Sequence, residues 1–347
     1  MASVLYRPWR LAGPTADFVE QVIDIAHQYL ADGYTMTLRQ LYYQVVAHDL
    51  FPDDRCWRRL DSGRWVRDPD GTKNAEPNYK WLGDFVTRAR MAGMLDWDAV
   101  EDRTRAVWQP PAWDGPRELL DACASQYNED VWDSQPRRVE VWIEKEALAG
   151  VVVRPSERAG VPYFCCRGYV SKSEMRVAAL RLLGHLFHGQ AVTVLHLGDH
   201  DPSGVDMTRD IRDQLTEFIT FDWARARGPV PDPSAEEVWD SIAETTGVDP
   251  GQALVVERIA LNMDQIRRYQ PPPNPAKIGD SRSGKYIEQF GEQSWELDSL
   301  PPNLMEELIT AEVERRCNLA WLRQRRAEVE GQRTRLREIA ATWGGTP

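Results

Sequence analysis

The sequence has no long hydrophobic segment and few cysteines, and these absences exclude several classes of protein. No apolar run approaches the roughly 20 residues that span a bilayer, and the N-terminus, Met1 to Arg7, lacks the apolar core of a signal peptide. The five cysteines form no Cys-x-x-Cys pair, which argues against a zinc finger or a disulfide framework. We therefore expect a cytoplasmic protein of a reducing compartment, without membrane attachment.

Several common catalytic signatures are also missing. There is no Gly-x-Ser-x-Gly elbow and no kinase motif set. The histidines between His185 and His200 follow no metal-binding spacing, although His200 is placed to assist an acidic site. Residues 279–286 resemble a phosphate-binding P-loop, but Tyr286 stands where Ser or Thr would hold Mg²⁺, so ATP binding is not expected there.

The net charge of −12 does not suggest nucleic-acid binding, but the cations are unevenly distributed. Arginines gather between residues 55 and 67, around Trp57 and Trp65. Residues 315–337 hold eight arginines against Glu328 and Glu330. This C-terminal run is either a solvated helix face or a DNA contact.

Helical periodicity predicts helices at residues 15–31, 37–49 and 79–92. A short hairpin is expected through residues 103–108, and residues 52–77 are interpreted as a loop or insertion. Three helices followed by a short β element are typical of a winged-helix module, here residues 1–108. A plain three-helix packing unit is the alternative.

The rest of the chain alternates between strand and helix patterns. After a linker with one helix, residues 109–136, strands are predicted at 139–143, 161–166, 191–195 and 253–260, with helices at 175–187 and 204–218 between them. This alternation predicts an α/β domain, residues 137–300, with a mostly parallel sheet and helices on its faces. Residues 301–347 are interpreted as a helical, basic extension.

Acidic residues follow two of these strands. Asp199 and Asp201, just beyond the run 191–195, point the same way on an extended chain. At about 4 Å their charges repel by roughly 4 kcal/mol, which a cation between them would offset. Glu144 directly follows strand 139–143, and ligands of open α/β sheets gather at strand carboxyl ends. If the strands are neighbours, Glu144, Asp199 and Asp201 converge and suit Mg²⁺, or Mn²⁺; otherwise Asp-x-Asp-Pro-x-Gly is a polar turn.

Tyr43 lies off the apolar stripe that includes Tyr42, four residues after Arg39 on the predicted helix. A guanidinium beside a phenol can bind a phosphate and favour the phenolate, which normally forms near pH 10. Tyr43 activated in this way could act as a covalent nucleophile. The alternative is an amphipathic tyrosine at a helix edge.

Together these residues resemble a known family. Glu144 after one strand and Asp199-x-Asp201-Pro202-x-Gly204 after another resemble the Toprim domain of topoisomerases, primases and some nucleases. Arg39-x-x-Tyr42-Tyr43, well upstream, resembles the A subunit of type IIB DNA topoisomerase (topoisomerase VI) and the related meiotic double-strand-break protein. Residues 295–301 also resemble a segment near the C-terminal end of that family.

The resemblance implies a nucleoid-associated homodimer that cleaves double-stranded DNA. Tyr43 of one protomer would face the acidic site of the other, attack a backbone phosphate and remain attached to the 5′ end. Mg²⁺ would be held by Glu144, Asp199 and Asp201, and Arg39 would steady the phosphate; Glu144 could instead act as general acid or base. A separate ATPase subunit of the topoisomerase B type could be a partner. Phosphate contacts are expected from a set of basic side chains: Arg55, Arg58, Arg59, Lys80, Arg88 and Arg90.

Two other functions stay open at this stage. A related plasmid-defence nuclease subunit keeps the winged-helix and Toprim plan without relying on the tyrosine. By that analogy, the chain could be a Toprim nuclease that uses metal-activated water, with Tyr43 structural. It could also be a DNA-binding or scaffold protein without catalytic activity.

Overall fold

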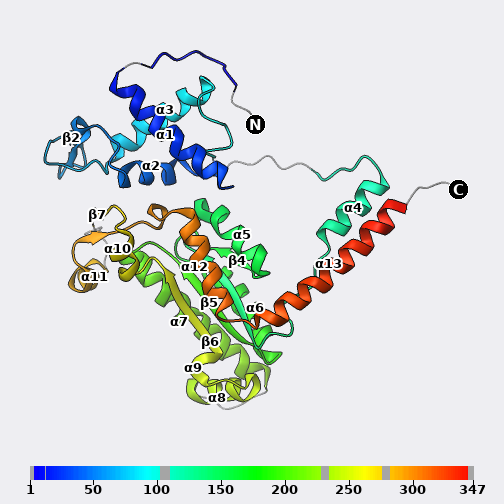
Figure 1. Ribbon diagram of the computed structural model, residues 1–347. Coiled ribbons are helices and arrows are strands. Elements are labelled where there is room, and N and C mark those ends of the chain that lie inside the picture. Colours follow the sequence, from blue (N-terminus) through cyan, green and yellow to red (C-terminus); the bar gives the residue numbers. More distant parts are fainter. Residues whose placement is uncertain (1–3, 12, 102–109, 228–233, 276–281, 343–347) are drawn as a thin grey trace.

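The computed structural model describes residues 4–11, 13–101, 110–227, 234–275 and 282–342. A helical N-terminal unit lies against an α/β unit, and two helices extend from the α/β unit as an arm (Figure 1). No helix in these described ranges is both long and apolar enough to cross a membrane.

The N-terminal unit consists of three helices around one apolar core. These helices are α1 (Pro14–Ala31), α2 (Leu38–Ala47) and α3 (Glu76–Met91). Phe18, Leu41 and Leu82, one from each helix, are buried together in this core. All three predicted helices are thus confirmed.

The interpretation of residues 52–77 as a loop is wrong in part. After a 3₁₀ turn at Asp53–Arg55, strands β1 (Trp57–Arg59) and β2 (Trp65–Arg67) form an antiparallel hairpin. The Arg67 guanidinium stacks over the Trp57 ring at 4.3 Å, and the Trp57 indole donates to Asn78 of α3. These two contacts hold the hairpin together and connect it to α3, although the segment is rich in charged residues. The hairpin expected at residues 103–108 lies outside the described residues.

A four-stranded parallel sheet forms the centre of the α/β unit, and its strand order is β4-β3-β5-β6. The strands are β3 (Arg137–Ile143), β4 (Tyr163–Cys165), β5 (Ala191–Leu197) and β6 (Leu254–Ala260). This confirms the predicted α/β class with a parallel sheet. It also makes the two strands that precede the acidic residues, β3 and β5, direct neighbours.

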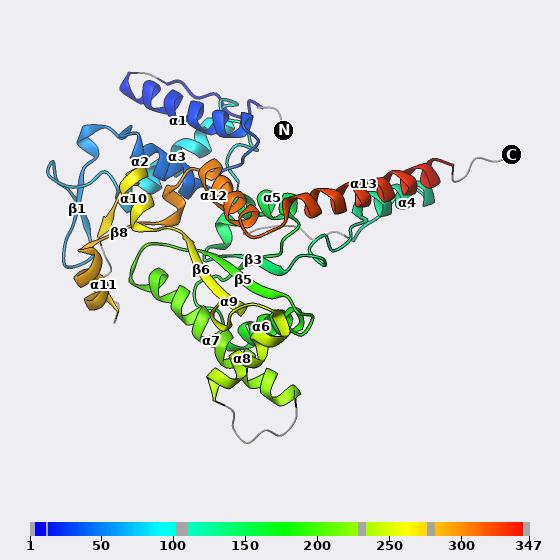
Figure 2. The ribbon, with the colours of Figure 1, turned by 60° about the horizontal axis from the view of Figure 1, so that its bottom comes forward.

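Helices cover both faces of this sheet (Figure 2). Val139, Val141 and Leu195 point to the face under α5 (Ala149–Ala159) and α12 (Pro302–Glu314). Trp142 and Val194, at alternate positions, pack on the other face with α6 (Lys172–Phe187), α7 (Pro202–Ala226) and α8 (Ala235–Thr246). Burial on both faces explains why β5 is mainly apolar, with all seven of its residues buried.

Shorter elements complete this unit. They are the 3₁₀ turns at Glu146–Leu148 and Leu297–Ser299, the helices α9 (Pro250–Ala253), α10 (Met263–Tyr269) and α11 (Ser283–Phe290), and the strands β7 (Asn274–Pro275) and β8 (Gln293–Ser294). The paired strands β7 and β8 lie next to α2, so they bring a late part of the chain to the N-terminal unit (Figure 1).

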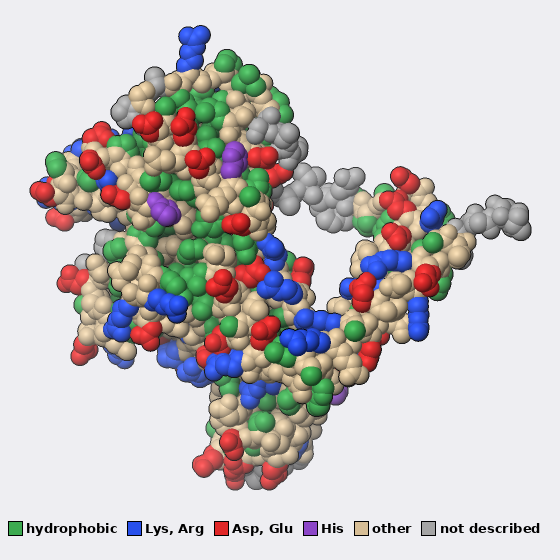
Figure 3. All heavy atoms as spheres, viewed as in Figure 1, with side chains coloured by type: hydrophobic (Ala, Val, Ile, Leu, Met, Phe, Trp, Pro, Cys, Tyr) green, Lys and Arg blue, Asp and Glu red, His purple; other side chains and the backbone are tan. Residues whose placement is uncertain are grey.

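The arm joins α4 (Pro116–Gln126) to the C-terminal helix α13 (Leu319–Thr342). Arg325 pairs with Glu129 at 2.7 Å, and Arg333 donates to the Tyr127 carbonyl. Basic side chains gather where α13 joins the body (Figure 3). Several arginines of this run are paired with carboxylates, among them Arg315, Arg316, Arg325, Arg333 and Arg337, so its cationic excess is partly neutralised.

Polar side chains connect the two units. The Tyr34 hydroxyl donates to Glu306 of α12 at 2.6 Å, and Arg154 of α5 donates to the Gly33 carbonyl. Arg39 of α2 pairs with Glu296 at 2.6 Å. The contact between Arg39 and Glu296 connects α2 to the acidic residues at the edge of the sheet.

Substitution of Thr37 tests how α2 is held at this interface. The Thr37 hydroxyl accepts the Gln40 N–H, and the Gln40 side chain accepts the Thr37 N–H, which forms a capping box. Thr37→Ala should lower the free energy of unfolding by about 1 kcal/mol, because a buried N–H loses its acceptor. Urea unfolding measures this change, and equal midpoints for variant and wild type would contradict the role of the cap.

Candidate active site

Glu144 and Asp199 meet at the carboxyl ends of β3 and β5. The Glu144 N–H donates to the Leu197 carbonyl, which continues the parallel ladder past the end of β3. The Glu144 carboxylate in turn accepts the Asp199 N–H at 2.8 Å. The sequence prediction that these two residues lie at one edge is therefore confirmed in its geometry.

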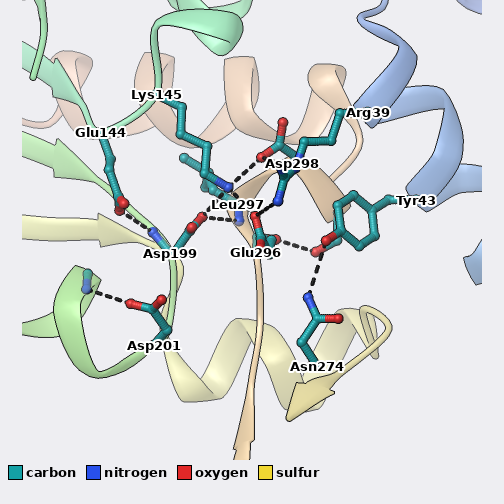
Figure 4. A network of polar contacts seen from close by, with 12 residues as sticks. Arg39, Tyr43, Glu144, Lys145, Asp199, Asp201, Asn274, Glu296, Leu297 and Asp298 are labelled. Atoms are coloured by element: carbon teal, nitrogen blue, oxygen red, sulfur yellow. Dashed lines mark hydrogen bonds and ion pairs between the residues drawn. The ribbon is translucent and has the colours of Figure 1, made fainter. Parts of the chain in front are cut away.

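Asp201 acts electrostatically on Glu144, but its carboxylate also has partners that the sequence analysis did not expect. Its carboxylate accepts the Gly204 N–H at 2.7 Å and the Ser203 hydroxyl at 2.8 Å, at the start of α7 (Figure 4). Pro202 begins α7, so Asp201 becomes its N-cap and satisfies N–H groups that have no partner within the helix. Asp201 is thus turned to the helix start, although Asp199 is only two residues away.

Glu296 and Asp298 join Asp199 instead. In the described part of the chain, one group of three potential metal ligands has its ligand atoms within 4.8 Å of one another, and it consists of Asp199, Glu296 and Asp298. His200 and Trp295 pair through two backbone hydrogen bonds, and the Leu297 N–H donates to Asp199 at 2.8 Å. This pairing places a segment far along the chain beside the end of β5.

Sequence reasoning used residues 295–301 only for a family resemblance and did not assign Glu296 and Asp298 to the site. A signal for them was present in the sequence. Glu296-x-Asp298 repeats the spacing of Asp199-x-Asp201, and it follows an apolar residue that the structure buries, Trp295.

Lys145 lies at the centre of this acidic cluster, as Figure 4 shows. Its Nζ is 2.8 Å from Asp199 Oδ1, 2.5 Å from Glu296 Oε2 and 2.5 Å from Asp298 Oδ2. Although burial lowers the pKa of Lys145, the three carboxylates raise it well above its usual value. Lys145 is therefore a fixed positive charge in this arrangement.

The acidic groups respond to burial as well as to their neighbours. Burial raises the pKa of Asp199 to about 7, against the opposing effect of Lys145. Burial also raises the pKa of Glu144, while the hydrogen bond from the Asp199 N–H lowers it. Both carboxyl groups thus titrate closer to neutral pH than ordinary acids, as is common for groups that transfer protons.

The cluster has a donor set that suits a divalent cation. All three side chains offer carboxylate oxygens, the ligands that Mg²⁺ and Mn²⁺ prefer. Asp298 is fully buried, and its Oδ1 has no hydrogen-bond partner. When all three carboxylates are ionised, Lys145 and Arg39 balance two of their three negative charges.

Tyr43 is close to this cluster but is not activated in the way the sequence suggested. Its side chain is only 4% exposed, and its hydroxyl accepts a hydrogen bond from Asn274 at 3.2 Å. Burial and then Glu296 raise the pKa of Tyr43, while Asn274 and Arg39 oppose them. Arg39 does lower the pKa of Tyr43, as the sequence predicted, but burial outweighs it, and the Arg39 guanidinium is also paired with Glu296.

A groove of about 910 Å³ opens between the β1–β2 hairpin, α3 and the acidic edge. Its lining includes Tyr43, Arg59, Trp65, Asp201 and Glu296. Tyr43 thus shares one groove with Asp201 and Glu296 of the same chain, whereas the family resemblance implies that the tyrosine faces the acidic site of the other protomer.

The six basic residues expected to contact DNA differ in their surroundings. Arg59 lines the groove and Arg88 is exposed on α3. The others make contacts within the chain: Arg55 with Trp81, Arg58 with Asp68, Lys80 with Glu76 and Arg90 with Trp97. His200 is also turned away from the acids, with its Nδ1 hydrogen-bonded to the Tyr286 hydroxyl.

Arg258 holds the loop that carries Asp199. Its buried guanidinium donates to the carbonyls of Gly198 at 2.7 Å and Gly204 at 2.9 Å, and also to that of Asp199. The sequence analysis did not single out this residue. A charge within the predicted buried strand 253–260 was the available signal, since a buried charge requires partners.

Comparisons with protein-family models, with curated proteins and with solved structures each find no match. The function of this site is therefore inferred from its geometry.

His196 lies on β5 next to Arg258, and its titration tests whether water is excluded from this edge of the sheet. It is fully buried, and burial followed by Arg258 lowers its pKa to about 3. Between pH 6.5 and about 3, the folded chain binds fewer protons at His196 than the unfolded chain does. Its stabilising contribution is complete above pH 6.5 and is lost as the pH falls.

We therefore expect the stability advantage of the wild type over His196→Asn to shrink below pH 6.5, by up to about 1.4 kcal/mol per pH unit. Urea unfolding of both proteins at several pH values between 7 and 4 measures the difference. Parallel pH profiles would show that His196 titrates normally.

Proposed function

We propose that the protein is a metal-dependent enzyme that cleaves DNA by hydrolysis. The observation that carries this proposal is the buried cluster of Asp199, Glu296 and Asp298 at the carboxyl edge of a parallel sheet, with Glu296 also lining an open groove. Hydrolysis by activated water was the alternative that the sequence left open, and the surroundings of Tyr43 now favour it.

The proposal includes a Toprim-like α/β unit and a winged-helix-like N-terminal unit. Acidic residues beyond β3 and β5 of the parallel sheet support the first part. The three helices of the N-terminal unit, with a hairpin between α2 and α3, support the second part. Arg59 of this hairpin is placed to contact a backbone phosphate in the groove.

Asp199, Glu296 and Asp298 would hold the divalent cation. A bound ion of this kind supplies positive charge at the phosphate and lowers the pKa of a bound water. Arg39, beside Glu296, would orient the phosphate. Glu144 would accept or donate the proton, since its raised pKa brings it nearer to neutral pH.

Tyrosine transesterification is the second candidate, and one observation favours it. The Tyr43 side chain lines the same groove as Glu296 and Asp201, so a phosphate bound there would lie near the phenol. In this variant of the proposal, Tyr43 would form a 5′-phosphotyrosyl link, either within one chain or across a homodimer. Double-stranded DNA as the substrate and a separate ATPase partner belong to the same proposal.

Substitutions in the acidic cluster test the main proposal. Glu296→Gln and Asp298→Asn should each reduce Mg²⁺-dependent cleavage of supercoiled plasmid by about 100-fold, because each removes a ligand of the cation that stabilises the transition state. Glu236→Gln, an exposed position on α8, is the matched control and should retain wild-type activity. Full activity in both cluster variants would reject the proposal, and a protein that binds DNA but never cleaves it would be a binding module.

The variant Tyr43→Phe distinguishes hydrolysis by water from transesterification by the tyrosine. Under hydrolysis, the variant should cleave within about threefold of the wild type, since it loses hydrogen bonds of the hydroxyl, such as the one from Asn274, each worth about 1 kcal/mol, and no reacting group. End-labelled DNA resolved on denaturing gels should show free 5′ phosphates for both proteins. Loss of cleavage in the variant, together with a protein–DNA adduct in the wild type, would establish transesterification instead.

A further inference from the structure

We infer that the Lys145 ammonium and a divalent cation are alternative occupants of one position, so that a metal ion binds Asp199, Glu296 and Asp298 only by displacing Lys145. This inference deepens the proposed function and rests on its assignment of a metal to this cluster. It concerns how the site is kept assembled without metal, and which side chain must move when a metal arrives.

The distances leave no room for both cations. Lys145 Nζ is within 2.8 Å of all three carboxylates, and the ligand atoms of these carboxylates lie within 4.8 Å of one another. Mg²⁺ binds oxygen at about 2.0–2.1 Å, so an ion that contacts all three groups would lie where Nζ now lies. Two cations at that separation would also repel each other strongly.

Charge and hydrogen bonding both favour the exchange. When all three carboxylates are ionised, they carry one net negative charge together with Lys145 and Arg39. Replacing the single charge of Lys145 by a dication makes the same group neutral. The fully buried Asp298 contacts Lys145 through Oδ2 alone, and its Oδ1 has no hydrogen-bond partner, so this carboxylate is not saturated while Lys145 is in place.

The Lys145 side chain is also able to leave. Lys145 lies just past the end of β3, directly before the 3₁₀ turn Glu146–Leu148, and its side chain is 19% exposed. A rotation about its side-chain bonds would move the ammonium outward without disturbing β3. The cost of breaking three ion pairs would then make metal binding weaker than an empty carboxylate triad would allow.

Calorimetric titration with MnCl2, in the absence of DNA, tests this exchange. Lys145→Gln removes the competing charge and should bind Mn²⁺ at least tenfold more tightly than the wild type. Lys172→Gln, on the exposed surface of α6, removes one lysine charge far from the cluster and should bind Mn²⁺ like the wild type. Equal or weaker Mn²⁺ binding by Lys145→Gln would overturn the inference.

A measurement on the wild-type protein covers the case in which Lys145→Gln fails to fold. The chain has only six lysines, so the ammonium signals of ¹⁵N-lysine-labelled protein can be resolved by NMR. Titration with MgCl2 should change the signal of Lys145 while the remaining lysine signals stay in place. Saturable Mg²⁺ binding with an unchanged Lys145 signal would overturn the inference.

These outcomes are distinct from those of the cleavage assays. Competition between Mn²⁺ and Lys145 in a protein that cleaves no DNA would reject the proposed function alone. Mg²⁺-dependent cleavage together with equal Mn²⁺ affinity in wild type and Lys145→Gln would reject the inference alone.

Discussion

The structure depends on the neutralisation of three carboxylates that meet in a largely buried position. Asp199, Glu296 and Asp298 come from two distant segments, and their mutual repulsion would separate them without a positive charge between them. Lys145 supplies that charge through three ion pairs, and Arg39 adds a second cation from the N-terminal unit. One electrostatic cluster thus joins the end of β3, the end of β5, the segment after β8, and helix α2.

The rest of the fold serves to bring these segments together. Parallel pairing of β3 with β5 places Glu144 beside Asp199, and the backbone bonds between His200 and Trp295 add the late segment. Arg258 fixes the intervening loop through its carbonyls. The groove beside this edge is lined by side chains of both units, so a substrate bound there would contact the hairpin and the acidic edge at once.

The burial of Tyr43 shows how context changes the chemistry of a residue. The pair Arg39 and Tyr43 has the spacing that would activate a phenol on an isolated helix. In the folded chain, Glu296 takes the guanidinium and burial disfavours the charged phenolate. Asp201 changes in a similar way, because Pro202 starts a helix whose N–H groups bind the carboxylate. Both residues lie where the sequence predicts, yet each side chain has partners that the local pattern does not contain.

The sequence by itself determined the α/β class, the helices of the N-terminal unit, and the meeting of Glu144 with Asp199. These features follow from local periodicity, from the mainly apolar sequence of β5, and from the rule that parallel strands end at the same edge. Only the tertiary structure decided that Glu296 and Asp298 lie beside Asp199, that Lys145 lies between them, and that Asp201 caps α7. Those outcomes depend on contacts between segments far apart in the chain, and on burial, neither of which a local pattern contains.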